Sequence, residues 1–142
     1  MSPVLFCVYL DELLQRLHES GVGCYIGSVF VGALAYADDI ALLAPTPSAM
    51  RRLLKICDTF GTEFSVAFNS SKSACVVVSR RKYCFDGGLQ FTIGDSQISV
   101  VNDYVHLGLR DGQSAARGPH AAPGFLLCGP PTSAEEIKCV AL

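Results

Sequence analysis

Apolar residues recur at helical spacing in two segments of the chain, and each segment opens with a hydroxyl residue followed by proline. Ser2-Pro3 and Thr46-Pro47 both suit a helix start, because the hydroxyl can cap free amides and proline fits the first turn. The first apolar series is Phe6, Leu10, Leu13, Leu14 and Leu17, and the second is Met50, Leu53, Leu54, Cys57, Phe60 and Phe64. The pattern predicts two helices, the second of which packs its apolar stripe on a sheet and exposes Arg51, Arg52 and Lys55.

Between and after these helices, short β-prone segments alternate with polar turns. The expected strand segments are 24–31, 34–36, 40–44, 66–68, 74–78, 89–93, 97–101 and 104–107. Asp38-Asp39 stands between two of them, so we expect a β-hairpin with both aspartates at its turn. Residues 109–142 are rich in Gly, Ala, Ser and Pro and have no sustained period, so we expect a disordered or weakly structured tail.

Composition limits the classes of protein that the chain can represent. Half of its 142 residues are hydrophobic, which is more than one small self-contained domain needs and indicates surfaces that meet a neighbour. The apolar runs are shorter than the roughly 20 residues of a membrane-spanning helix, and no basic segment of a signal peptide precedes them. We therefore expect no membrane partner and an intracellular location, in the cytoplasm or the nucleus.

A net charge of −2 gives no basic excess for an autonomous nucleic-acid binder, so such a function would belong to a larger protein.

The cysteines do not indicate a metal site. There are seven of them, without a Cys-x-x-Cys pair, which argues against both a zinc centre and a complete disulfide framework. We expect reduced and mostly buried thiols.

Adjacent carboxylates at a tight turn repel one another unless a cation offsets their charge. Mg²⁺ suits such oxygen ligands, and two-metal phosphoryl transfer requires carboxylates that a rigid backbone holds in place. For an isolated Asp-Asp pair a solvated turn would be the default interpretation. Here the surrounding sequence favours a metal site at Asp38 and Asp39.

Four ordered motifs resemble the reverse transcriptases. Tyr36-Ala37-Asp38-Asp39 is similar to the signature hairpin of that family, and Ser2-Pro3-Val4-Leu5-Phe6 to the helix after its Arg-Gln-Gly loop. Asn69 with Lys72-Ser73 is similar to the next motif, and Tyr104-Val105-His106-Leu107-Gly108 to the primer-grip hairpin. The resemblance covers residues 2–108 and is closest to the non-LTR, LINE-type retrotransposons. It implies a partial palm of α+β class: two helices on an antiparallel sheet with a β-hairpin, followed by the tail at 109–142.

The resemblance also implies roles for individual residues in RNA-templated DNA synthesis. Asp38 and Asp39 would bind Mg²⁺, and Lys72 would assist departing pyrophosphate, although a solvated turn lysine is an equal alternative. Residues 104–108, including Tyr104, His106, Leu107 and Gly108, would position the primer's 3′ end, with His106 itself favoured as a packing residue. Tyr36 would brace the primer backbone or fill the palm core. Apart from the resemblance, Arg80-Arg81-Lys82 are expected to form an exposed strand end, with contact to nucleic-acid phosphates as the alternative.

The sequence also departs from the family pattern. The family's other catalytic aspartate lies on a strand upstream of the first helix, and the printed chain starts after that point, as it does after the fingers and the Arg-Gln-Gly loop. We therefore expect a primer–template, dNTPs and Mg²⁺ to be partners of a longer protein, and the chain alone to be inactive. Two alternatives stay open: a non-catalytic retrotransposon-derived remnant or interaction module, and a small Mg²⁺-dependent phosphohydrolase.

Overall fold

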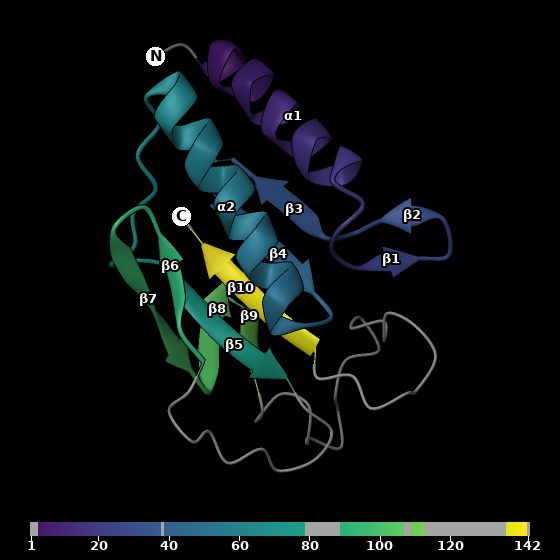
Figure 1. The fold of residues 1–142 in the computed structure, drawn as a ribbon, viewed down its shortest axis with the longest axis vertical. Coiled ribbons are helices and arrows are strands. Elements are labelled where there is room, and N and C mark those ends of the chain that lie inside the picture. The colour runs from purple at the N-terminus through teal and green to yellow at the C-terminus, as the bar shows by residue number, and fades with distance from the viewer. Residues whose placement is uncertain (1–2, 38, 79–88, 107–108, 113–135, 142) are drawn as a thin grey trace.

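The computed structural model describes residues 3–37, 39–78, 89–106, 109–112 and 136–141, which form helices on one side of a mixed sheet (Figure 1). The helices are α1 (Pro3–Glu19) and α2 (Pro47–Phe64). The strands are β1 (Tyr25–Ile26), β2 (Val29–Phe30), β3 (Ala33–Tyr36), β4 (Asp39–Ala44), β5 (Ala74–Val78), β6 (Phe91–Ile93), β7 (Ser96–Val101), β8 (Asp103–His106), β9 (Leu109–Gly112) and β10 (Glu136–Ala141). This is the expected α+β architecture.

Helix α2 starts and packs as the sequence predicts. Thr46 has extended backbone, with φ of −144°, and its side chain accepts a hydrogen bond from the Ala49 amide at 3.2 Å. The helix ends at Ser65, whose φ of 57° is left-handed. The buried residues of its apolar stripe are Met50, Leu53, Leu54, Cys57 and Phe60, whereas Arg51, Arg52 and Lys55 are exposed. The predicted phase of this helix is confirmed.

The main sheet has six strands in the order β3-β4-β10-β5-β7-β6. Its pairings are antiparallel except for β5 with β7, which run parallel, so the sheet is mixed where we expected an antiparallel one. The parallel pair arises because β7, the second strand of the antiparallel β6–β7 pair, lies next to β5, while β6 lies at the edge of the sheet. Helix α1 contacts β3, and α2 contacts β4, β10 and β6, so both helices cover one face of the sheet (Figure 1).

Two segments of the expected low-order tail form strands. Strand β9 pairs with β8 in a separate two-stranded sheet, and β10 lies between β4 and β5 in the main sheet. Local sequence did not predict this, because six residues after a Gly- and Pro-rich stretch give little periodic signal, and the pairing partners are distant in the chain. The proposed division of the chain at residues 108 and 109 stays a prediction.

Two other strand predictions differ from the structure in detail. Residues 66–68 have no regular structure, since they follow the αL end of α2 and pair with none of the described strands. The segment 24–31 forms a small hairpin, β1 with β2, because the turn between Ile26 and Val29 contains Gly27 with a φ of 61°.

The core lies between the helices and the sheet. Leu13 and Leu17 of α1 and Leu53 of α2 are at most 1% exposed and pack in one cluster with Ile40 and Leu42 of β4 and Cys75 of β5. Val76, which strand alternation directs to the other face, is also fully buried, and β8 and β9 contact β5. The β8–β9 hairpin therefore covers that face of β5. Of the expected buried thiols, Cys24, Cys57 and Cys75 are buried.

One ion-pair network links the two helices at the surface. The Arg16 guanidinium contacts Glu12 and Glu63 carboxylate oxygens, each at 2.6 Å. The hydrogen bond from Arg16 lowers the pKa of the Glu63 carboxyl below its ordinary value, and the same bonds raise the pKa of Arg16. No helix in the described part of the chain is long and apolar enough to span a membrane.

Candidate active site

Asp39, one of the two predicted aspartates, is the first residue of β4, directly after the turn that follows β3. Tyr36 at the end of β3 pairs with Asp39 at the start of β4, so the hairpin turns between these two residues. Ala37, next to Tyr36, has a φ of 51°, which is the left-handed conformation that the first position of a tight hairpin turn demands. Asp38 lies outside the described residues. The prediction of a hairpin at this position is supported by the described residues on either side of Asp38.

Register and alternation determine which way the hairpin's side chains face. Directly paired residues share a face, so Tyr36 and Asp39 project together, as do Leu34 and Ala41 one step along. The alternate residue Ile40 is 2% exposed and belongs to the core under the helices. Asp39 and Tyr36 therefore lie on the sheet face that points away from α1 and α2.

That face is open at the hairpin. Tyr36 is 67% exposed and Leu34 is 51% exposed, so neither side chain is part of the core that the described residues form. Asp39 is partly buried, and no lysine or arginine among the described residues forms an ion pair with it. The Asp39 carboxylate is thus held on a strand, beside an exposed phenol, without a neutralising cation from the described chain.

Lys72 lies at the same end of the sheet as Asp39. Strand β10 runs antiparallel to both β4 and β5, and its Val140 pairs with Ala41 on one side and with Ala74 on the other. The starts of β4 and β5 are therefore level, two strand spacings or about 10 Å apart. Lys72 precedes β5 by two residues and is exposed.

Asn69 holds the backbone before β5 in a compact turn. Its side-chain oxygen accepts hydrogen bonds from the amides of Ser71 at 3.1 Å and of Lys72 at 3.3 Å. Its carbonyl oxygen accepts from the Ser73 hydroxyl at 2.8 Å. The asparagine and lysine of this motif are thus connected through the backbone: Asn69 fixes the position from which Lys72 projects.

The primer-grip-like segment forms the β8–β9 hairpin. Tyr104 pairs with Asp111 and His106 with Leu109. Leu107 and Gly108 lie outside the described residues, as do Arg80, Arg81 and Lys82. The structure places this hairpin against β5, on the face opposite the helices, which is also the face of Tyr36 and Asp39.

The donor chemistry of the turn fits Mg²⁺ in kind, although the described residues do not form a complete site. Carboxylate oxygens are the ligands that Mg²⁺ prefers. Among the residues that the structure describes, no group of three or more His, Cys, Asp or Glu side chains is arranged to hold a metal ion. Asp39 would share the ion with Asp38 and with ligands from elsewhere.

One residue of the turn was missed by sequence reasoning. The motif gave Ala37 no role of its own, yet its left-handed backbone directs the chain through the turn. The signal that could have indicated this is the short connection between the two apolar segments. A two-residue hairpin connection requires a positive φ at its first position, whatever the residue.

Comparisons with known proteins agree with this geometry. The family described as reverse transcriptase (RNA-dependent DNA polymerase) matches residues 1–114. A Pol polyprotein of the type-2 retrotransposable element R2DM from Drosophila melanogaster is 27% identical over 96% of the chain. Pol polyproteins of type-1 retrotransposable elements R2 are 28% identical over 77% of the chain in Nasonia vitripennis and 30% identical over 84% in Popillia japonica.

The chain spans only 12%, 11% and 18% of the lengths of these three relatives. No solved structure matches it. Since the family match covers most of the chain and includes the β3–β4 turn, the β5 loop and the β8–β9 hairpin, the chain belongs to the reverse transcriptase family, as part of a reverse transcriptase domain of the non-LTR type.

Proposed function

We propose that this chain supplies the metal-binding turn of a palm that synthesises DNA on an RNA template. The observation that carries the proposal is the pairing of Tyr36 with Asp39 at a tight hairpin, with Asp39 on the open face and without a basic partner in the described chain. A carboxylate in this position is available to a divalent cation. Primer–template and dNTPs would be the partners of the complete polymerase.

Each residue has a proposed task. Asp38 and Asp39 hold Mg²⁺, which when bound stabilises charge on the attacking and leaving oxygens. Lys72, projecting from the turn that Asn69 fixes, offers a proton or a positive charge to the departing pyrophosphate. Tyr36 lies beside Asp39 and presents its exposed ring to the primer backbone. The β8–β9 hairpin, with Tyr104, His106, Leu107 and Gly108, holds the primer's 3′ end.

The proposal is tested in a chimaera, because the chain spans a small part of its relatives. Residues 1–108 replace the matching segment of the R2DM polyprotein, and primer extension on an RNA template is measured with Mg²⁺ and dNTPs. We expect extension by the chimaera and a loss of roughly hundredfold or more with Asp39→Asn, since metal stabilisation of transition-state charge contributes several kcal/mol.

The matched control is Asp95→Asn, which makes the same chemical change in the exposed turn between β6 and β7. This variant should extend primers as the parent chimaera does. Equal activity of the Asp39→Asn and parent chimaeras would refute the proposed role of the turn.

A further inference from the structure

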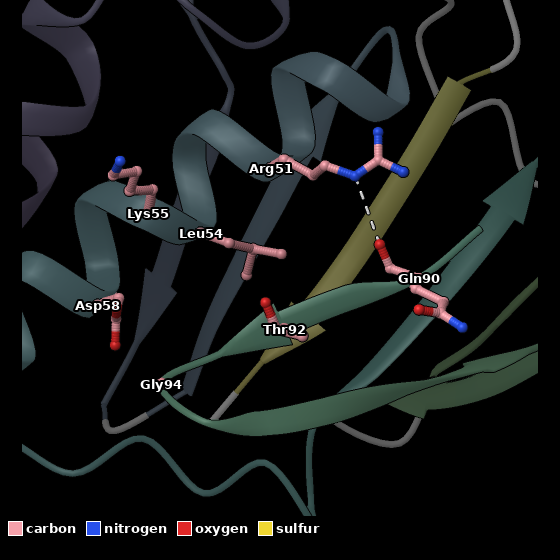
Figure 2. Close-up of a pocket in the computed structure, with 7 residues that line it drawn as sticks. All are labelled: Arg51, Leu54, Lys55, Asp58, Gln90, Thr92 and Gly94. Carbon is pink, nitrogen blue, oxygen red and sulfur yellow. Dashed lines mark hydrogen bonds between the residues drawn. The ribbon is translucent and has the colours of Figure 1, made fainter.

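We propose that the cleft between α2 and β6 binds the sugar–phosphate backbone of a nucleic-acid strand, as a second contact separate from the β3–β4 turn. The cleft has a volume of about 580 Å³. Helix α2 lines it with Arg51, Leu54, Lys55 and Asp58, and the β6 side contributes Thr92 and Gly94 (Figure 2).

Arg51 is anchored at one end of this cleft. Its Nε donates a hydrogen bond to the carbonyl oxygen of Gln90 at 3.4 Å (Figure 2). Its guanidinium carbon lies 5.5 Å from the centre of the Phe91 ring. These two contacts fix the plane of the guanidinium, and its two terminal nitrogens form no hydrogen bond with the residues that the structure describes. A planar, preorganised guanidinium is well suited to a phosphate group.

The charge of the cleft is unequal along its length. Arg51 and Lys55 are exposed, one helical turn apart on α2, and neither forms an ion pair within the described part of the chain. The acidic residue Asp58 lies at the other end, where its Oδ1 would be 3.6 Å from a Cβ atom added to Gly94. Figure 2 shows the Arg51 guanidinium at the Gln90 end and the Lys55 side chain pointing away from it. An anion is therefore attracted to the Arg51 end and repelled from Asp58.

The lining favours a backbone phosphate over a nucleobase or a free nucleotide. A base would need an exposed ring or apolar wall for stacking, but Phe91 and Leu54 are each only 1% exposed. What the cleft offers is two cations and the Thr92 hydroxyl, which serve phosphate and sugar oxygens. Binding should accordingly depend on salt and little on sequence.

The cleft and the candidate active site lie at opposite edges of the sheet. Strand β6 is one edge and β3 the other, five strand spacings or about 24 Å apart. The cleft also opens beside α2, whereas Asp39 faces away from the helices. A nucleic-acid segment bound in the cleft would therefore differ from one bound at the β3–β4 turn. Binding in the cleft can be measured without Mg²⁺ or dNTPs.

The test measures binding of a fluorescent 20-nucleotide single-stranded RNA to the purified chain by anisotropy, in EDTA and across a salt series. We expect Lys55→Gln and Arg51→Gln each to raise the Kd about three- to tenfold and to reduce the salt slope by about 0.7, the value for one lost phosphate contact on a single strand. Asp58→Asn should lower the Kd.

Arg52→Gln is the matched control, because Arg52 is exposed on the same helix, does not line the cleft and carries the same charge. The Arg52→Gln and Lys55→Gln variants have the same net charge, yet the Kd of the Arg52 variant should stay within about twofold of the parent's. Within the ranges that the structure describes, the Lys55 side chain has no hydrogen bond or ring contact like those of Arg51, so the Lys55 variant keeps the test valid if Arg51→Gln fails to fold.

Three results would overturn the proposal. The first is the absence of RNA binding at low salt. The second is an equal loss of RNA affinity in the Lys55 and Arg52 variants. The third is an unchanged RNA affinity in the Lys55 variant, while inorganic phosphate still shifts the Arg51 Nε–H resonance. The last result would identify a site for free phosphate only. None of the three depends on polymerisation, so the proposed function is tested separately.

Discussion

Ala37 shows how a single backbone conformation shapes the candidate site. An L-residue with a left-handed backbone costs about 1–2 kcal/mol relative to its preferred conformations, because its Cβ approaches the following carbonyl oxygen. The adjacent pairing of Tyr36 with Asp39 keeps the chain in this conformation. The turn therefore carries local strain next to a carboxylate proposed to bind metal.

Replacing Ala37 with glycine should stabilise the fold. Glycine removes the steric cost at a positive φ, although it adds conformational freedom to the unfolded chain, so we expect a net gain of up to about 1 kcal/mol in the free energy of unfolding. Urea denaturation followed by circular dichroism measures it. Ala35→Gly, in the adjacent strand, should instead destabilise the chain, and a loss of stability in both variants would argue against strain at Ala37.

At the scale of the residue, sequence reasoning reached the chemistry but not the conformation. Asp38, Asp39 and Lys72 were selected by residue type and order, and the structure brings Asp39 and the Lys72 loop to one end of the sheet. The exposure of Tyr36 was undecided from sequence, because a tyrosine after an apolar strand suits both a core and a surface. The face it occupies follows from the register with Asp39, which requires the structure.

Among the elements, α2 was the most predictable, because its start and its buried stripe depend on local features. A hydroxyl cap, a proline in the first turn and an uninterrupted apolar period all specify the same helix. The strand prediction for residues 66–68 was wrong for the opposite reason. These three residues fit a strand by composition, but no strand in the described part of the chain pairs with them.

The Thr46 cap should contribute measurably to the free energy of unfolding. Thr46→Ala removes the acceptor for the Ala49 amide and should reduce the free energy of unfolding by about 1 kcal/mol, whereas Thr46→Ser should retain most of it. Thr59→Ala is the matched control, since Thr59 is exposed in mid-helix and only bonds back to the Lys55 carbonyl. Denaturant midpoints that fall equally for the Thr46 and Thr59 alanine variants would contradict the capping role.

The link between α1 and α2 predicts a dependence on pH. Because Arg16 lowers the pKa of Glu63, their contact stabilises the folded chain above the carboxyl's ordinary pKa of 4.5 and is lost as the pH falls through the lower, folded-state value. Glu63→Gln should therefore lower the Tm at pH 7, and the difference from the parent should shrink towards pH 3.

Glu19→Gln provides the control for this pH series. The Glu19 carboxylate accepts a hydrogen bond from Gln15 at 2.8 Å and is not paired with Arg16. Its substitution should change the Tm little at either pH. A Glu63→Gln effect of constant size from pH 7 to pH 3 would show that the ion pair is not its cause.

At the scale of the whole molecule, the most consequential pairing is the one that local sequence could not predict. Residues Glu136–Ala141 pair on both sides, with β4 and with β5, and so connect the hairpin of Asp39 to the strand after Lys72. Long-range strand pairing leaves no local period, so the tail was expected to lack order. Helix α2 and the β3–β4 hairpin were predictable because each is built from neighbouring segments.

Interrupting β10 should disrupt the sheet. Lys138 lies mid-strand and pairs with Leu43 and Val76, so Lys138→Pro removes a ladder donor from the interior of the sheet. We expect a loss of cooperative unfolding and faster amide exchange in β4 and β5. Lys138→Ala keeps the backbone donor and should remain cooperative, and a proline variant with unchanged exchange would show that β10 does not occupy this position.

The 142-residue polypeptide by itself should show no measurable polymerisation. Two-metal catalysis needs more carboxylates than one adjacent pair supplies, and orientation of the reactants contributes about 7–11 kcal/mol in well-aligned reactions. The assay compares the polypeptide with its Asp38→Ala, Asp39→Ala variant on a primer–template with dNTPs and Mg²⁺. Incorporation by the parent that disappears in the variant would show that these 142 residues suffice.

The central place of β10 also has a consequence for how the chain reaches its native state. The residues that β10 joins to β4 are separated by about one hundred positions in the chain, which gives the sheet a high contact order. On the ribosome, β4 and β5 emerge before the strand that lies between them and would wait as unpaired edges. Their protection by a chaperone, or their direct pairing with one another, would then decide the yield of folded protein during synthesis.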